Sequence, residues 1–100
     1  MQQTIRVIGV GVPPEKIEEV EHAYRTSLLS ITERHEGFNA LLLLWDPDTQ
    51  EALEITLWED EEARRSSEEQ GGPVPKKLEA LGEIVGERPA FQSYELRIIS

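Results

Sequence analysis

The residues best suited to chemistry gather on one face of the predicted strand that ends at Trp58. Because side chains alternate along a strand, Glu54, Thr56 and Trp58 share that face. The strand order expected below places Arg6 next to Glu54, with Glu95 on its other side. A buried charge needs a partner, so Arg6 is expected to pair with Glu54 or Glu95. Two interpretations stay open: a polar floor for a small-molecule pocket capped by Trp58, or a set of cross-strand ion pairs that could fix the register of a dimer.

Two side chains of the first predicted helix bring further polar groups to its buried side. Tyr24 and His35 lie on the apolar stripe of that helix. His35 is interpreted either as a base in a pocket or as a half-buried histidine that the negative end of the helix dipole stabilises. His22 lies on the solvent side of the helix.

The sequence contains no recognisable metal or cofactor motif. Its two histidines stand thirteen positions apart and the chain has no cysteine, so no converging set of metal ligands is evident. Gly9 and Gly11 lack the rest of a dinucleotide-binding fingerprint. The acidic run 59–62 is interpreted as the start of a helix, where the dipole favours negative charge. No metal and no cofactor are therefore expected.

Composition bounds the class of protein. One hundred residues are enough for a single domain, expected to span 1–100. The formal net charge of −10 repels nucleic-acid phosphates, and no basic stripe offsets it. No apolar run approaches the roughly 20 residues of a membrane span, and the first residues show no cleavable leader. Together with the absence of cysteine, these features predict a cytoplasmic protein that binds neither nucleic acid nor membrane.

The pattern of apolar residues predicts an α+β fold. Apolar periods, proline and glycine indicate strands over 4–12, 38–45, 52–58 and 89–99, and helices over 14–35, 60–70 and 74–85. Gly37 is expected as a left-handed cap after the first helix. Short connections and right-handed crossovers favour a ferredoxin-like four-stranded antiparallel sheet, with the first and third strands central and the helices on one face.

Four consecutive leucines predict how the other face of the sheet is covered. Leu41 and Leu43 point to one face, and Leu42 and Leu44 to the other. A bare face carrying two leucines, with neighbours such as Ile8 and Val10, would be an unusually apolar exposed surface. We therefore expect a two-fold homodimer with its sheets packed together. The alternative is a monomer in which edge helices or the C-terminus curl over this face.

Three stretches of the chain resemble one known family. They are Glu36-Gly37-Phe38, the hairpin through Trp45-Asp46-Pro47, and the segment from Thr56 to Ala63 with the sequence TLWEDEEA. In these residues and in the order of its elements, the chain resembles antibiotic-biosynthesis-monooxygenase-like domains of the dimeric α/β-barrel superfamily. The resemblance implies a ferredoxin-like subunit, a homodimer with packed sheets, and a pocket between the sheet and the helices.

The resemblance implies different chemistry in different branches of the family. Trp58 matches the tryptophan that lines the pocket of haem-degrading members. Those members also carry an asparagine on the first strand and a histidine on a late helix, which segments 5–10 and 74–84 lack, so haem degradation is disfavoured. Quinone-forming oxygenases of the family use polar pockets of asparagine, tryptophan, tyrosine and arginine. The resulting candidate pocket residues are Arg6, Tyr24, His35, Glu54, Thr56, Trp58, Tyr94 and Arg97.

Two functions stay open from the sequence. The first is a dimeric barrel that binds a small aromatic or quinol molecule and acts as a cofactor-independent monooxygenase, with Trp58 as a pocket wall and Arg6 or Arg97 steadying an anion. The second is a ligand-binding or structural dimer with the same fold and no catalysis. An open, polar cavity beside Trp58 would favour the enzyme.

Overall fold

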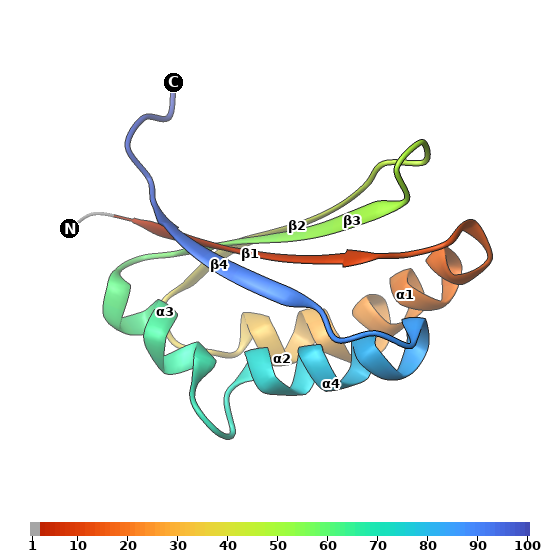
Figure 1. Ribbon diagram of the computed structural model, residues 1–100. Coiled ribbons are helices and arrows are strands. Elements are labelled where there is room, and N and C mark those ends of the chain that lie inside the picture. Colours follow the sequence, from red (N-terminus) through yellow and green to blue (C-terminus); the bar gives the residue numbers. More distant parts are fainter. Residues whose placement is uncertain (1–2) are drawn as a thin grey trace.

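The computed structural model describes residues 3–100 as a sheet covered by a layer of helices (Figure 1). The elements follow in the order β1 (Thr4–Gly11), η1 (Pro14–Lys16), α1 (Ile17–Ala23), η2 (Tyr24–Leu28), α2 (Leu29–Glu33), β2 (Phe38–Trp45), β3 (Glu51–Trp58), α3 (Glu61–Glu68), α4 (Pro73–Val85) and β4 (Ala90–Glu95). No helix in residues 3–100 is long and apolar enough to cross a membrane.

The sheet has the order β2-β3-β1-β4, and every neighbouring pair is antiparallel. All helices lie on the same side of the sheet (Figure 1). This arrangement confirms the predicted α+β, ferredoxin-like fold with the first and third strands central. The apolar core lies between sheet and helices and consists of Ile8, Val10, Val12, Val20, Tyr24, Leu28, Ala52, Val74, Leu78 and Leu81.

Several predicted boundaries differ from the structure, and two of these differences affect candidate residues. The first helical segment is helical from Pro14 to Glu33 and includes a π-helical turn, η2, so His35 lies in the turn after the helix and not within it. The last strand ends at Glu95, so the predicted extension to Ile99 is wrong. Apolar alternation continues past Glu95 in the sequence, but the pairing of β1 with β4 ends at Thr4 and Glu95, although the backbone N–H of Leu96 still donates to the carbonyl oxygen of Gln3 at 3.1 Å.

The alternation of the four leucines is confirmed. Leu41 and Leu43 pack against the core beneath the helices. Leu42 and Leu44 point to the other face, where they are 46% and 45% exposed.

The predicted placement of Ile8 and Val10 on the bare face is wrong. Both are buried in the core on the helix side. Strand β1 is apolar on both faces, because Ile5 and Val7 alternate with them, so hydrophobicity alone could not decide which set faces the helices.

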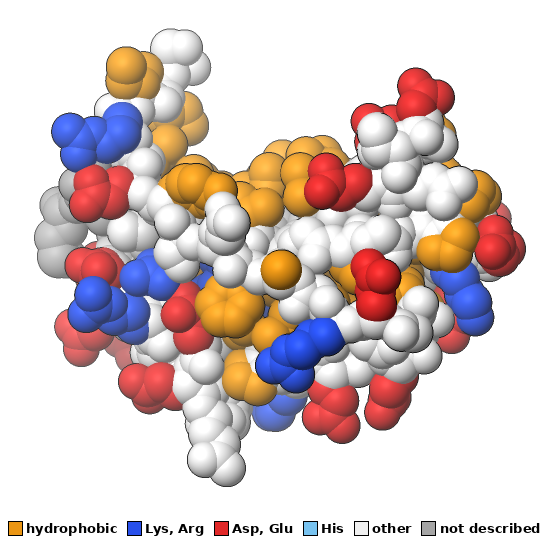
Figure 2. Space-filling view, in the orientation of Figure 1, with side chains coloured by type: hydrophobic (Ala, Val, Ile, Leu, Met, Phe, Trp, Pro, Cys, Tyr) orange, Lys and Arg blue, Asp and Glu red, His pale blue; other side chains and the backbone are white. Residues whose placement is uncertain are grey.

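The bare face of the sheet is apolar and hollowed (Figure 2). Its strand residues, identified by the pairing register, include one charged side chain, Glu51 at the start of β3. The others are Ile5, Val7, Gly9, Gly11, Ala40, Leu42, Leu44, Leu53, Ile55, Leu57, Ala90, Gln92 and Tyr94. The C-terminal segment rises beside this face, and its residues Ile98 and Ile99 are exposed (Figure 1). None of the helices in the described residues 3–100 covers the face (Figure 1).

Gly37 joins α2 to β2 in the left-handed conformation predicted for it, with φ of 85°. A side chain at this position would also collide with Cβ of Ala63 on α3. Gly86 at the end of α4 has almost the same φ, 82°, but open space around it. A comparison of substitutions at Gly37 and Gly86 therefore separates the cost of backbone strain from the cost of crowding by a neighbouring side chain.

Replacing Gly37 with alanine is therefore expected to lower the free energy of unfolding more than Gly86→Ala does. Left-handed backbone costs a residue with a Cβ about 1–2 kcal/mol in either place. At Gly37 the collision with Ala63 adds to that cost. Urea unfolding followed by circular dichroism measures both losses, and equal losses would show that α3 does not press on this turn.

Candidate functional site

A buried hydrogen-bonded triad lies in the layer between the sheet and the helices. Glu54 on β3 accepts a hydrogen bond on Oε1 from the Tyr24 hydroxyl, at 2.9 Å. Its Oε2 accepts one from Nζ of Lys77 on α4, at 3.0 Å. All three side chains are buried. We call Tyr24, Glu54 and Lys77 the inner triad.

Local sequence explains why these side chains meet. Alternation along β3 turns Glu54 toward the helices, as predicted. Lys77 stands three residues after Val74 and four before Leu81, so it lies on the buried stripe of α4. Tyr24 is the first residue of the π-helical turn η2 and reaches Glu54 from the opposite side of the layer.

Burial shapes the electrostatics of the inner triad. It lowers the pKa of Lys77 from its ordinary value, an effect that the negative charge of Glu54 opposes. Burial also raises the pKa of the Tyr24 hydroxyl, and the charge of Glu54 and its hydrogen bond raise it further. Tyr24 therefore stays protonated and donates to Glu54.

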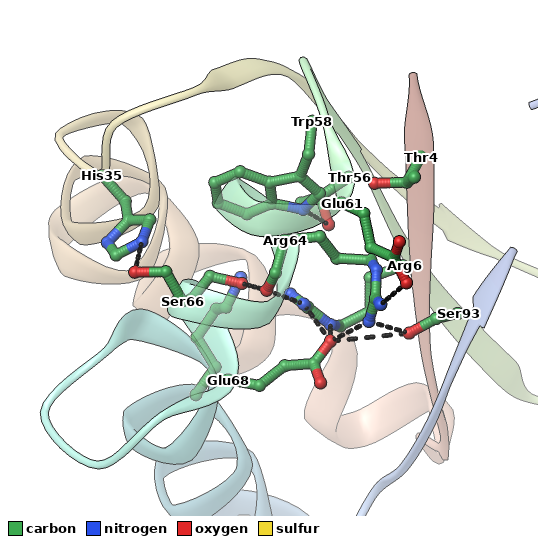
Figure 3. Close-up of polar contacts among 12 residues, drawn as sticks. Thr4, Arg6, His35, Thr56, Trp58, Glu61, Arg64, Ser66, Glu68 and Ser93 are labelled. Atoms are coloured by element: carbon green, nitrogen blue, oxygen red, sulfur yellow. Dashed lines mark hydrogen bonds and ion pairs between the residues drawn. The ribbon is translucent and has the colours of Figure 1, made fainter. Parts of the chain in front are cut away.

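A second polar cluster joins α3 to the sheet (Figure 3). The Arg6 guanidinium on β1 donates to Oε2 of Glu68, with distances of 2.5 Å from Nη2 and 3.2 Å from Nε. Arg64 donates to the same Glu68 oxygen at 2.6 Å and to the Ser93 hydroxyl at 2.6 Å. Arg6 also donates to the backbone oxygen of Arg64 at 2.7 Å. We call Arg6, Arg64, Glu68 and Ser93 the arginine cluster.

Side chains fill the space beside Trp58, where the sequence placed a pocket. The Trp58 side chain has 0% exposure, and its Nε1 donates to the Thr56 hydroxyl at 3.0 Å. Its ring meets those of His35 and Phe38 edge to face, with centroids 5.7 and 6.0 Å away. Cζ of Arg6 lies 5.7 Å from the Trp58 centroid, in a cation–π contact. In this structure Trp58 is a packed residue.

The predicted partners of Arg6 are wrong. Glu54 binds the inner triad, and Glu95 pairs with Arg97 at 2.9 Å on the surface. Arg6 pairs with Glu68, which comes from α3 and not from a neighbouring strand.

The candidate pocket residues do not form one group. Arg6, Thr56 and Trp58 meet at one end of the layer, where His35 also binds the Ser66 hydroxyl at 3.1 Å. Tyr24 and Glu54 meet in the inner triad. Tyr94 lies on the bare face of the sheet and Arg97 is exposed beyond β4, so neither faces these two groups.

Sequence reasoning missed four residues of these clusters: Lys77, Arg64, Glu68 and Ser93. A signal for Lys77 was present, because a lysine within an otherwise apolar helical stripe must find a buried partner. The signal for Arg64 and Glu68 was their spacing of four residues on a helix whose inward face offers few apolar side chains. The predicted helix start is confirmed, since Oδ1 of Asp60 accepts from the Ala63 backbone at 2.8 Å.

An open cleft lies on the side of the layer near β2. Its volume is about 290 Å³, and its lining is Ile17, Glu21, Tyr24, Arg25, Leu29, Leu41, Leu43, Leu44 and Trp45. The charged groups of this lining, Glu21 and Arg25, pair with each other at 3.5 Å. Leucines with two aromatic side chains suit a flat apolar molecule, and the ion pair could contact its polar group. We call this space the β2 cleft.

A small inner hollow of about 10 Å³ lies deeper in the same layer. Tyr24 and Leu43 line both this hollow and the β2 cleft, so they form the partition between the two spaces. Glu54 lines the hollow but not the β2 cleft. Within residues 3–100, no three histidine or acidic side chains converge as metal ligands would.

The fold and this layer between sheet and helices are those of antibiotic-biosynthesis-monooxygenase-like structures, so the resemblance predicted from the sequence is confirmed at the level of fold. At the level of sequence, no protein-family model and no curated protein matches the chain. The likeness is one of three-dimensional structure, at identities that show the fold alone.

Three solved structures illustrate this likeness in three-dimensional structure. A monooxygenase from the gene ActVA-Orf6 of Streptomyces coelicolor, solved with the ligand nanaomycin D, gives a TM-score of 0.78 at 15% identity, covering 99% of this chain and 90% of that one. A mutant of SnoaB, a cofactor-independent oxygenase from Streptomyces nogalater, gives 0.61 at 19% identity over 100% and 96% of the two chains. The haem-degrading protein Rv3592 from Mycobacterium tuberculosis gives 0.66 at 17% identity over 98% of each.

Breaking the inner triad from one side is expected to cost more than removing its ion pair whole. Glu54→Gln leaves Lys77 as an unpaired buried charge, and Lys77→Met leaves Glu54 as an unpaired buried charge. Each single change should lower the free energy of unfolding by about 3–5 kcal/mol. The double variant Glu54→Gln/Lys77→Met should lose less than either single variant, as chemical denaturation would measure. Additive losses would show that the two groups do not act as a pair.

Proposed function

We propose that this protein binds a small aromatic molecule in the β2 cleft. The observation that carries the proposal is the position of the cleft: an open, mostly apolar space whose inner wall is the buried Tyr24 of the inner triad. Tyr24 and Trp45 offer aromatic surfaces to a flat ligand, while Arg25 at the lining offers a positive charge to an acidic hydroxyl. The monooxygenase that shares the fold and was solved with nanaomycin D supports this class of ligand.

The reaction that fits this ligand is cofactor-independent oxygenation of an electron-rich hydroxy-aromatic or quinol. Once such a ligand is an anion, it can reduce dioxygen itself, and the protein supplies orientation and a water-poor surrounding. The fold neighbour SnoaB supports this class of reaction. The filled space around Trp58 favours the second function, a binding dimer without catalysis, because the site matched to the family through Trp58 has no room for a substrate.

We further propose that the working form is a two-fold homodimer through the bare face of the sheet. That face combines exposed leucines with a single charged strand residue, Glu51 at the start of β3, in a chain whose net charge is −10. A hollow of about 390 Å³ on it, lined in part by Val7, Leu53 and Tyr94, would take side chains of a second copy. A twin molecule brings an equally apolar surface, so Glu51 is the one charged strand residue that the contact must leave in water.

A lysine at the centre of the bare face is expected to separate the dimer. Ile55→Lys and Leu42→Lys would each force a charge into the contact between the sheets, so sedimentation velocity at micromolar concentration should show monomers. Ser30→Lys makes the same change of charge on the exposed surface of α2 and should leave the dimer intact. A wild-type protein that sediments as a folded monomer at high micromolar concentration would contradict the dimer.

Filling the β2 cleft is expected to block ligand binding. Trp45 lines the cleft whereas Trp58 is buried away from it, so Trp58→Phe leaves a single fluorescent reporter at the site. In that background a hydroxyanthrone should quench the fluorescence of Trp45. Adding Leu29→Phe, which fills the cleft, should weaken binding by about tenfold or more, equivalent to about 1.4 kcal/mol.

The control adds the same bulk at the next residue, where Ser30→Phe points to solvent and should leave binding unchanged. Equal binding by the Leu29 and Ser30 variants would place the ligand elsewhere. Oxygen uptake with the same hydroxyanthrone then separates the two functions. Uptake that Leu29→Phe abolishes supports the oxygenase, and binding without uptake supports the dimer without catalysis.

A further inference from the structure

We infer that the arginine cluster is a binding site for the carboxylate group of a small organic acid, and that Glu68 occupies this site until the ligand takes its place. The site lies between the end of α3 and the strands β1 and β4. It is separate from the β2 cleft, whose lining includes none of Arg6, Arg64 and Glu68. The inference therefore does not depend on the proposed function.

Two arginines converge on one oxygen of the Glu68 carboxylate. Nε and Nη2 of Arg6 and Nη1 of Arg64 donate to Oε2 of Glu68, at 3.2, 2.5 and 2.6 Å. The Ser93 hydroxyl lies 3.5 Å from the same oxygen. The second oxygen of the carboxylate points away from both arginines (Figure 3). Two planar guanidinium groups, each suited to bind a carboxylate through both of its oxygens, thus share one half of a single carboxylate.

Arg6 keeps a donor for a further acceptor. Its side chain is 0% exposed, and its Nη1 has no hydrogen-bond partner among residues 3–100. A buried donor without an acceptor costs free energy. Burial lowers the pKa of Arg6, the hydrogen bond and charge of Glu68 oppose this effect, and the charge of Arg64 adds to it. A carboxylate that is not tied to α3 can turn both oxygens toward the arginines and satisfy donors that Glu68 does not reach.

The place of Glu68 in the chain allows the exchange. Glu68 is the last residue of α3 and its side chain is 23% exposed, so it can rotate into solvent while the helix stays in place. An open space of about 200 Å³ lies beside the cluster and has Arg64 and Ser93 in its lining. A small acid can enter there and place its carboxylate against the side chains that now hold Glu68.

The acidic residues at this opening do not exclude an anion. Glu61 and Glu95 line the same space, but Glu61 pairs with Arg65 at 2.8 Å and Glu95 with Arg97 at 2.9 Å. Together with the arginine cluster, these ion pairs contain four arginines and three carboxylates, so one positive charge is in excess. The excess is local, because the net charge of the chain is −10.

Competition by Glu68 gives the inference a consequence that a purely structural cluster would not have. A side chain of the protein competes with a free ligand at a high effective concentration. The apparent affinity of the ligand falls by the fraction of molecules in which Glu68 has left the arginines. If that fraction is about one tenth or less, removing the Glu68 carboxylate strengthens ligand binding about tenfold or more.

The test uses acetate as the probe and acetamide as its neutral counterpart. In the Trp45→Phe protein Trp58 is the one remaining tryptophan, and its ring centroid lies 5.7 Å from Cζ of Arg6, so its fluorescence reports exchange at the cluster. Acetate replaces chloride at constant ionic strength. Glu68→Gln is expected to bind acetate about tenfold more tightly than the protein with Glu68. Glu69→Gln makes the same change of charge at the next, exposed residue and should leave the affinity unchanged.

Further variants separate binding from a loss of structure. Arg6→Met/Glu68→Met removes the buried charge together with its partner, so the fold should persist while the response to acetate disappears. Where Glu68→Gln is unfolded in chloride, acetate but not acetamide should restore its circular dichroism spectrum. Leu29→Phe, which fills the β2 cleft, should leave the response to acetate unchanged.

Several results would overturn the inference. They are acetate binding by Glu68→Gln that is no tighter than by Glu69→Gln, an equal response to acetamide, a response that persists in Arg6→Met/Glu68→Met, and an unfolded Glu68→Gln protein that acetate does not refold. Loss of the response in Leu29→Phe would place acetate in the β2 cleft and would overturn it as well. The proposal of an aromatic ligand in that cleft would still be judged by the quenching of Trp45.

Discussion

The interior of this protein is organised around one carboxylate. Glu54 lies on a central strand beneath the helices, where an unpaired charge would cost several kcal/mol. It is satisfied from two sides, by Lys77 on α4 and by Tyr24 on η2, which stand 23 and 30 residues away in the chain. The two halves of the helical layer are thereby held to one point of the sheet. Burial lowers the pKa of Lys77 from its ordinary value, and the charge of Glu54 opposes that change.

Much of the fold follows from local patterns in the sequence. Strands and helices have different apolar periods, Gly37 and the prolines mark boundaries, and short connections restrict the strand order. Which face of β1 meets the helices could not be read in the same way, because Ile5 and Val7 are as apolar as Ile8 and Val10. The end of β4 depends on the length of its partner strand, which is a property of the assembled sheet.

The candidate site was less predictable because its partners come from the helices. Alternation correctly placed Glu54, Thr56 and Trp58 on one face, but it carries no information on how α3 and α4 are rotated above that face. Glu68 and Lys77 were therefore missed, and Arg6 was assigned to the wrong partner. Resemblance drew attention to Trp58, whereas the open space lies next to Tyr24 and Trp45.

The helices α3 and α4 are attached to the sheet by different forces. Helix α4 buries Val74, Leu78 and Leu81, while α3 reaches the sheet through Arg64 and the partly exposed Glu68. A strongly excluded salt such as sulfate increases the drive to bury apolar surface and at the same time screens ion pairs that water can reach. Rising sulfate concentration therefore strengthens the apolar packing of α4 on the sheet. At the same time it weakens the ion pairs that hold α3 near Trp58.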